Sequence, residues 1–315
     1  MAYLARFFLD RILLNPISRV KSLWMLCGLI MVSPLMGASG FLLDRVFTHS
    51  ETGSLIGPGL TVTSLFGNGA RLAETDYFQV KMDYFNYLFD YQSLSVSVAF
   101  PVSGGGLGVG YSRLGVEDVP YVSNPDVERP AIQGYFASGY DTLVLAYGMS
   151  VFEGTEVGVK VSGLRHFLAN SYAQSVALDL AFWHRFTPWL WMGAFTDQWL
   201  HTPFKWTGDS HVEDSLNPRL MVSLGVHWDR YKVSVVSDFD LMRYQGSFGL
   251  ISTLGIVSDI VVSRLGEINQ VGYGLSLDLG DISLNYMRST YRYAALDDIV
   301  DKFGLVVQIV DYGYY

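Results

Sequence analysis

The sequence predicts an all-β protein, a transmembrane antiparallel β-barrel of about fourteen strands preceded by a short plug-like segment. From Phe78 onward, stretches of roughly ten residues alternate apolar with small or polar side chains, and turn residues separate them. Half of the 315 residues are hydrophobic and only 16% are charged, against about 25% in soluble domains. After residue 40 there is no run of about 18 to 20 apolar residues for a spanning helix. Together these observations favour strands in a membrane.

Residues 1–40 have the order of features of a secretory signal peptide, so we expect the mature chain to begin near residue 41. The basic residues of this leader are Arg6, Arg11, Arg19 and Lys21. An apolar stretch at residues 23–32 and the small residues of PLMGASG follow. An uncleaved anchor is the alternative, although Pro34 and the short apolar stretch disfavour it. Removal of the leader would also remove Cys27, the single cysteine, and with it any disulfide, thiolate metal site or cysteine nucleophile.

The remaining elements follow from the change in pattern along the chain. Residues 41–77 lack a sustained period, which predicts either a plug inside the lumen or a loose periplasmic tail. Residues 78–315 form the barrel. The expected strands are residues 78–88, 92–100, 107–114, 140–151, 156–164, 175–185, 190–199, 219–228, 231–241, 246–256, 258–266, 271–279, 282–289 and 303–312. Two long polar stretches, residues 115–139 and 201–218, predict large external loops.

Tryptophans near the ends of the expected strands predict the aromatic girdles of a membrane barrel. They are Trp183, Trp189, Trp191, Trp199, Trp206 and Trp228. The chain ends on the aromatic Tyr315, as a barrel-assembly signal would, although Asp311 interrupts the apolar alternation before it.

Ionisable residues within the strand segments predict a polar network in the lumen. Exposing Arg or Lys to lipid at the midplane costs about 2 to 4 kcal/mol, so such residues should face the lumen or lie near the interface. The network residues are Lys81, Asp83, Asp179, Asp238, Asp240, Arg243, Arg264 and Asp278, and Lys160 and Arg288 belong to the same class. A structural role and a role in a solute path both remain open.

No local motif of the chain predicts catalysis, so we expect no enzyme, no catalytic residue, no metal and no cofactor. GGGLGVG at residues 104–110 lacks the GxGxxG spacing, and it predicts a hairpin turn and a narrow strand start. Two acidic clusters fit neither a calcium loop nor a zinc site and are expected in solvated loops. They are Asp209, His211, Glu213 and Asp214 in one loop, and Asp297, Asp298 and Asp301 in the last connection. A net charge of −9 disfavours binding of nucleic acid.

Several stretches resemble the FadL-like outer-membrane family, in particular its PorV-related branch. They are AFPVSGGGLGVGYSRLGVEDVP, YDTLVLAYGMSVFEGTEVGVKVSGL, SVALDLAFWHRFTPWLWMGAF and PRLMVSLGVHW. The family often carries an Asn-Pro-Ala element in its amino-terminal plug, where this chain has GNGARLAETD at residues 67–76. No ligand-contacting residue of the family matches by position.

The resemblance implies a barrel in outer-membrane lipid that passes a hydrophobic ligand, such as a long-chain fatty acid, across the outer membrane. An alternative is a structural or docking barrel that holds an envelope protein partner and transports no solute, with the two long loops as its working surface. A third hypothesis, a membrane-bound hydrolase, would need one of His166, His184 or His227 beside a serine.

Overall fold

The computed structural model describes residues 61–86, 91–122, 132–207, 213–214, 218–229, 231–238, 243–251, 256–265, 268–293 and 296–309. The expected leader, residues 41–60 of the plug-like segment, Asp240 and residues 310–315 lie outside the described residues. In the described ranges, no helix has the length and apolar character to cross a membrane.

Seventeen strands and two short 3₁₀ helices make up the described regular structure. The helices are η2 (Thr61–Ser64) and η3 (Gly69–Glu74). The strands are β1 (Phe78–Asn86), β2 (Gln92–Val102), β3 (Gly105–Val122), β4 (Ile132–Phe152), β5 (Thr155–Leu168), β6 (Ser171–Thr187), β7 (Leu190–Asp197), β8 (Leu200–His201), β9 (Phe204–Trp206), β10 (Glu213–Asp214), β11 (Arg219–Trp228), β12 (Tyr231–Asp238), β13 (Arg243–Ile251), β14 (Ile256–Leu265), β15 (Ile268–Asp278), β16 (Ile282–Tyr293) and β17 (Leu296–Ile309). Each expected strand overlaps one of the longer strands.

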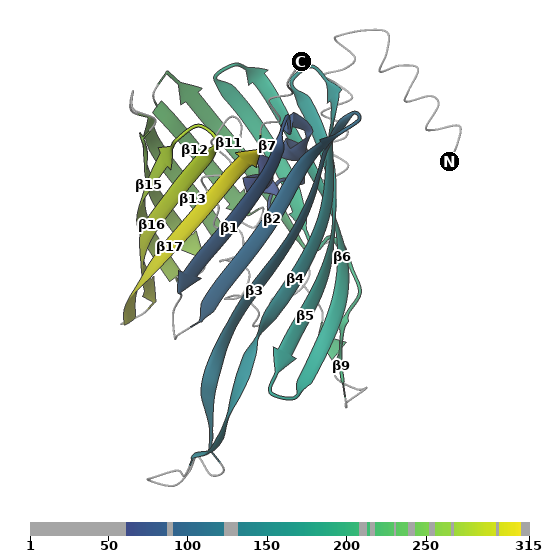
Figure 1. The fold of residues 1–315 in the computed structure, drawn as a ribbon, viewed down its shortest axis with the longest axis vertical. Helices are drawn as coiled ribbons and strands as arrows, with labels where there is room; N and C mark the ends of the chain where they lie inside the picture. The colour runs from purple at the N-terminus through teal and green to yellow at the C-terminus, as the bar shows by residue number, and fades with distance from the viewer. Residues whose placement is uncertain are drawn as a thin grey trace, which may run out of the picture. The chain divides into compact units, whose positions relative to one another are not determined.

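Antiparallel pairing closes these strands into a ring. β1 pairs with β2 on one side and with β17 on the other, and the two ends of the sheet lie side by side in Figure 1. β7 pairs directly with β11, while the short β8 and β9 pair with β6 and β10 pairs with β9. Without those three short strands, fourteen of the seventeen described strands form the ring. The prediction of a transmembrane barrel of about fourteen strands is confirmed.

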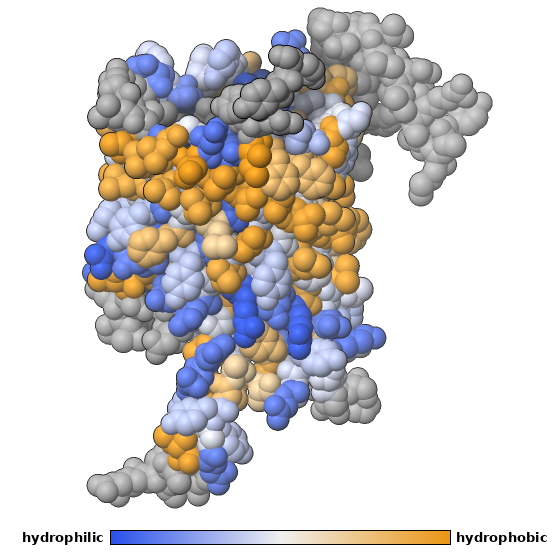
Figure 2. Space-filling view, in the orientation of Figure 1, coloured by the Kyte–Doolittle hydropathy of each residue, from blue (hydrophilic) through white to orange (hydrophobic). Residues whose placement is uncertain are grey.

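The two faces of the ring differ as the alternation predicts. On β1, Phe78, Met82 and Tyr84 are exposed on the outer face, whereas Gln79 and Lys81 are buried on the inner face. Figure 2 shows apolar side chains gathered into a band around the visible face. A closed ring pairs its backbone groups between strands, so lipid meets only side chains.

Charged side chains on the outer face mark one limit of the apolar band. Arg113, Asp141 and Arg165 are register neighbours on β3, β4 and β5, two residues beyond the apolar pair Tyr111 and Leu143. The eight residue-to-residue steps from Gly105 to Arg113 rise about 27 Å along the strand, or about 21 Å along the membrane normal at a tilt of about 40°. That height is close to the apolar band of about 25 Å in outer-membrane barrels.

A second charged group lies on the outer face of β16 and β17. Arg288 Nε is 3.4 Å from Asp301 Oδ1, and the Tyr286 hydroxyl donates to the same oxygen at 2.7 Å. Asp301, with Asp297 and Asp298, was expected in the last connection, but all three belong to β17. The short connection lies instead between residues 293 and 296.

The expected loop at residues 115–139 is largely strand. β3 and β4 continue beyond their neighbours as a two-stranded ribbon, because β2 pairs with β3 only as far as Gly115. Figure 1 shows this ribbon extending past the other strands. The register shifts between Val116 and Val119, where Asp118 has a φ of 57°. Pro120 suggested a loop, but β3 is an edge strand there, and edge strands tolerate proline.

Candidate functional site

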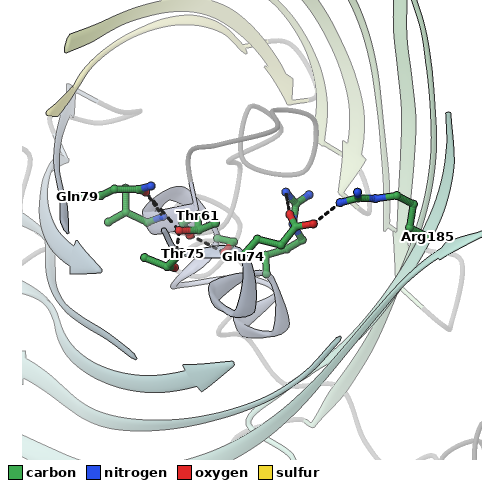
Figure 3. A network of polar contacts seen from close by, with 8 residues as sticks. Thr61, Glu74, Thr75, Gln79 and Arg185 are labelled. Carbon is green, nitrogen blue, oxygen red and sulfur yellow. Dashed lines mark hydrogen bonds and ion pairs between the residues drawn. The ribbon is translucent and has the colours of Figure 1, made fainter. Parts of the chain in front are cut away.

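Residues 61–75, called the inner segment below, run along the inside of the ring (Figure 3). η3 packs against β3, β4, β5 and β6, and η2 packs against β1 and β2. The described part of the plug-like segment therefore contacts the interior of the barrel.

Glycines on the inner face bring the inner segment unusually close to the wall. A Cβ added to any of them would meet backbone of the segment at a distance that real Cβ atoms essentially never show. The pairs are Gly106 with Leu72 O (2.1 Å), Gly148 with Ala73 N (2.7 Å) and Gly158 with Ala70 N (2.5 Å). A larger side chain at these positions must push the segment off the wall.

The GGGLGVG stretch does more than form a hairpin turn. Gly104, with a φ of 85°, does lie in the β2–β3 turn. Gly108 and Gly110 face inward, and a Cβ on either would come within 2.7 Å of the Leu65 side chain. Glycine at every second position of a strand was the available signal for a close approach. The sequence interpretation missed it.

Apolar side chains of the inner segment form the largest buried cluster among the described residues. Leu65, Phe66 and Leu72 are almost fully buried with Val62. They pack against Ala99 of β2, Val144 and Ala146 of β4, and Val306 of β17. The underside of the segment, meaning the side that packs against the barrel wall, is thus apolar.

Asn68 fixes the middle of the inner segment. Its side-chain Oδ1 accepts a hydrogen bond from Ala70 N at 3.2 Å, which caps η3. Its Nδ2 donates to the Phe182 carbonyl on β6 at 3.0 Å. Asn68 belongs to GNGARLAETD, the stretch that stands in place of the Asn-Pro-Ala element.

The two ends of the inner segment are held by polar contacts, which Figure 3 shows on opposite sides of the segment. Thr61 Oγ1 lies 2.6 Å from Thr75 Oγ1, and Gln79 Oε1 on β1 accepts from Val62 N at 3.0 Å. These bonds join the start of the segment to its end and to the wall.

On the other side, the Glu74 carboxylate binds two arginines. Arg71 Nη2 is 2.8 Å from Glu74 Oε2, and Arg185 of β6 binds Glu74 Oε1. Arg71 is buried, with its guanidinium carbon 4.4 Å from the centroid of the Trp183 ring. Glu156 of β5 is also buried beside Glu74 and Arg71. Two acids and two bases therefore join η3 to β5 and β6.

Lys160 connects the inner segment to a buried carboxylate. Its Nζ donates to the Phe66 carbonyl at 3.1 Å and lies 3.4 Å from Asp179 Oδ2. Asp179 Oδ1 accepts from Trp199 N at 3.1 Å, at the point where β7 gives way to β8. Both charged side chains are at most 5% exposed. A buried pair of this kind is costly to break.

Aromatic rings fill the same side of the lumen. Trp183 and Trp191 stack with centroids 4.2 Å apart, and Gly225 leaves space for the Trp191 ring. The prediction that these two tryptophans form a girdle is wrong, because both are buried beside Ala70 of η3. Trp228 and Trp189, by contrast, are 77% and 50% exposed, next to the turns.

A second aromatic group lies on β4, β5 and β9. His166 stacks on Tyr140 at 4.2 Å and meets the edge of Trp206 at 4.8 Å. Trp206 also packs against the buried cluster of Ala173 and Phe204. We call the inner faces of β3 to β9, which carry these rings and the glycines, the aromatic wall.

The expected network residues whose side chains the structure describes lie at three places in the barrel. Lys81 and Asp83 are buried on the inner face of β1, with Lys81 Nζ 2.7 Å from Asp83 Oδ2. Asp179 belongs instead to the pair with Lys160, between β5 and β6. Asp278 ends β15, where its Oδ1 accepts from Gly280 N at 3.1 Å and supports the turn.

Register places three more of the expected residues. Asp238 lies opposite Met221 on β11, and Arg243 lies opposite Leu265 on β14. Arg264 lies opposite Tyr244 on β13.

Solved structures share this fold. The CymD monoaromatic hydrocarbon channel is 9% identical with a TM-score of 0.55, covering 79% of this chain and 93% of that one. The Pseudomonas putida toluene transporter TodX is 11% identical with a TM-score of 0.56, covering 79% of this chain and 94% of that one. No protein-family model and no curated protein matches the sequence. At these identities the likeness establishes the fold, that of the hydrocarbon-channel barrels, and the PorV-related branch stays a prediction.

Proposed function

We propose that this barrel passes hydrophobic small molecules across the outer membrane, with long-chain fatty acids as one substrate class. The observation that carries the proposal is the inner segment, whose apolar Leu65, Phe66 and Leu72 pack inside the barrel on the same segment as Ala70, which contacts the cluster of Trp183 and Trp191. Sites that bind apolar ligands are lined mainly by such side chains, with few polar groups. The barrels of similar fold are channels for aromatic hydrocarbons, which supports the same class of solute.

The mechanism we propose is diffusion regulated by the inner segment. A hydrophobic molecule enters between the rings of the aromatic wall and meets the apolar underside of the segment. Movement of η3 away from Gly148 and Gly158 opens the way past it. The contacts that must loosen are those of Glu74 with Arg185 and of Lys160 with the Phe66 carbonyl.

Uptake of labelled oleate and toluene by vesicles containing the purified protein tests this function. We expect uptake above that of protein-free vesicles, and faster uptake by a Leu65→Ser, Leu72→Ser variant, because the segment then packs less tightly on its glycines. Leu143→Ser is the matched control, since Leu143 is exposed on the outer face of β4. Uptake no faster than in empty vesicles for both solutes would contradict the proposal.

The ribbon of β3 and β4 favours a second candidate function, docking of an envelope protein. It extends beyond the ring and carries exposed Tyr121, Ile132 and Tyr135. Removing residues 117–136 tests this alternative. A docking barrel would lose its co-purifying partner while the ring stays folded, whereas a transporter would keep its uptake.

A further inference from the structure

The inner faces of β15 and β16 carry mainly small and polar residues between Gln270 and Asp278 and between Ser283 and Ser289. The inward residues of β15 are Gln270, Gly272, Gly274, Ser276 and Asp278, and those of β16 are Ser283, Asn285, Met287 and Ser289. Only Met287 among them is apolar. The outward neighbours Val271, Leu275 and Leu284 are exposed and aliphatic, so the polarity belongs to the inner face alone.

The polar surface continues around the ring at one level. Register pairs join the inward residues of six neighbouring strands, from β3 through β2, β1, β17 and β16 to β15. They are Ser112, Ser95, Asp83, Gly304, Asn285 and Ser276. The one carboxylate, Asp83, is balanced by Lys81 at 2.7 Å. Ser112, Asp83 and Gly304 are buried, whereas Ser95, Asn285 and Ser276 are partly exposed. The exposed groups of the row are therefore two hydroxyls and one amide, without net charge.

A ring of fourteen strands is wide enough for more than one path. A strand spacing of about 4.8 Å and a tilt of about 40° give roughly 28 Å between opposite backbones, and two side-chain layers leave about 18 Å. The inner segment packs mainly against β1 to β6. β15 and β16 are not among its main contacts, so their polar faces are not explained by packing against the described part of the segment.

We propose that the inner faces of β15 and β16 form a hydrophilic track along which small uncharged polar solutes cross the membrane. Hydroxyl and amide side chains replace part of the hydration of such a solute, and the glycines keep the track wide. A hydrophobic molecule gains nothing there, because it must displace bound water without new apolar contact. The track is a second activity, beyond the hydrophobic uptake proposed above and independent of it.

Swelling of proteoliposomes in L-arabinose, an uncharged sugar, tests the track. We expect the full chain to swell vesicles faster than protein-free controls. Asn285→Phe and Ser276→Phe each place a ring on the track and should slow swelling severalfold. Leu284→Phe and Leu275→Phe are the matched controls, one residue away on the outer face, and should leave the rate unchanged. Heat-dependent gel mobility confirms that each variant has folded.

Oleate uptake measured on the same vesicles separates the two activities. Slower arabinose entry with unchanged oleate uptake in the folded Asn285→Phe or Ser276→Phe variant supports a separate track. Arabinose entry no faster than in protein-free vesicles overturns the track and leaves the hydrophobic path untouched. Equal losses of arabinose and oleate transport also overturn it, because both solutes would then share one path.

Discussion

The aromatic wall and the β15–β16 face belong to one ring and follow the same alternation, yet their inner faces have opposite chemistry. Where the inner segment packs, glycines such as Gly158 lie near large rings such as Trp183. Where the segment does not make its main contacts, inward positions such as Ser276 and Asn285 are small and polar. The period of two decides which residues face inward. What the inward face contacts decides which residue types stand there.

The largest difference between the two sides should appear when one inward side chain is truncated on each. Trp183→Ala removes a buried ring that contacts Arg71 and Trp191, and we expect the free energy of unfolding to fall by about 3 to 5 kcal/mol. Ser289→Ala, on the polar side, removes a hydroxyl bonded to Gln270 Nε2 at 3.0 Å, which should cost about 1 kcal/mol. Urea unfolding from lipid vesicles, followed by circular dichroism, measures both. Equal losses would show that the aromatic wall is no more tightly packed than the polar face.

The buried ion pair of the aromatic wall should be the next most sensitive feature. Lys160→Met leaves the Asp179 carboxylate buried without its cation, and we expect a loss of about 3 kcal/mol. The outer-face variant Arg288→Met should leave the stability nearly unchanged, because its pair with Asp301 is partly exposed to solvent. Adding Asp179→Leu to Lys160→Met should restore most of the stability, measured in the same unfolding experiment. A double variant as unstable as the single one would mean that Lys160 acts through the Phe66 carbonyl instead.

The strands themselves could be predicted from sequence because each short stretch carries its own signal. Alternation placed all fourteen ring strands, and it put Lys81 and Asp83 on the inner face. The positions at which the strands begin and end were less predictable. Pro120 and its acidic neighbours suggested a loop, since a sequence does not show that β3 is an edge strand at that point.

The contents of the lumen could not be predicted, because they depend on contacts between distant residues. Trp183 looks like a girdle tryptophan until Arg71, more than a hundred positions earlier in the chain, is known to lie over it.

Close packing between the inner segment and its glycines provides a third test. Gly158→Val puts a branched side chain where Ala70 N now lies, and overpacking of this kind should cost about 1 to 3 kcal/mol. Gly163→Val is the matched control on the same strand, because a Cβ there meets nothing within 4 Å. Thermal unfolding compares the two, and oleate uptake should also rise in the first variant as the segment is displaced. An equally stable Gly158→Val protein would mean that the segment moves aside without cost.

The smallest change in stability, with a clear change in function, should come from Arg185→Gln. Arg185 is 46% exposed, so screening by water limits its pair with Glu74 to about 0.5 kcal/mol. Glu74 keeps Arg71 as a partner, and the segment should stay folded on its glycines. The η3 end of the inner segment, however, loses its bond to β6. We therefore expect faster oleate uptake with a nearly unchanged free energy of unfolding. Arg165→Gln, on the outer face of β5, should change neither. If Arg185→Gln slows uptake instead, Arg185 must contact the solute itself, and its bond to Glu74 is then not what limits passage.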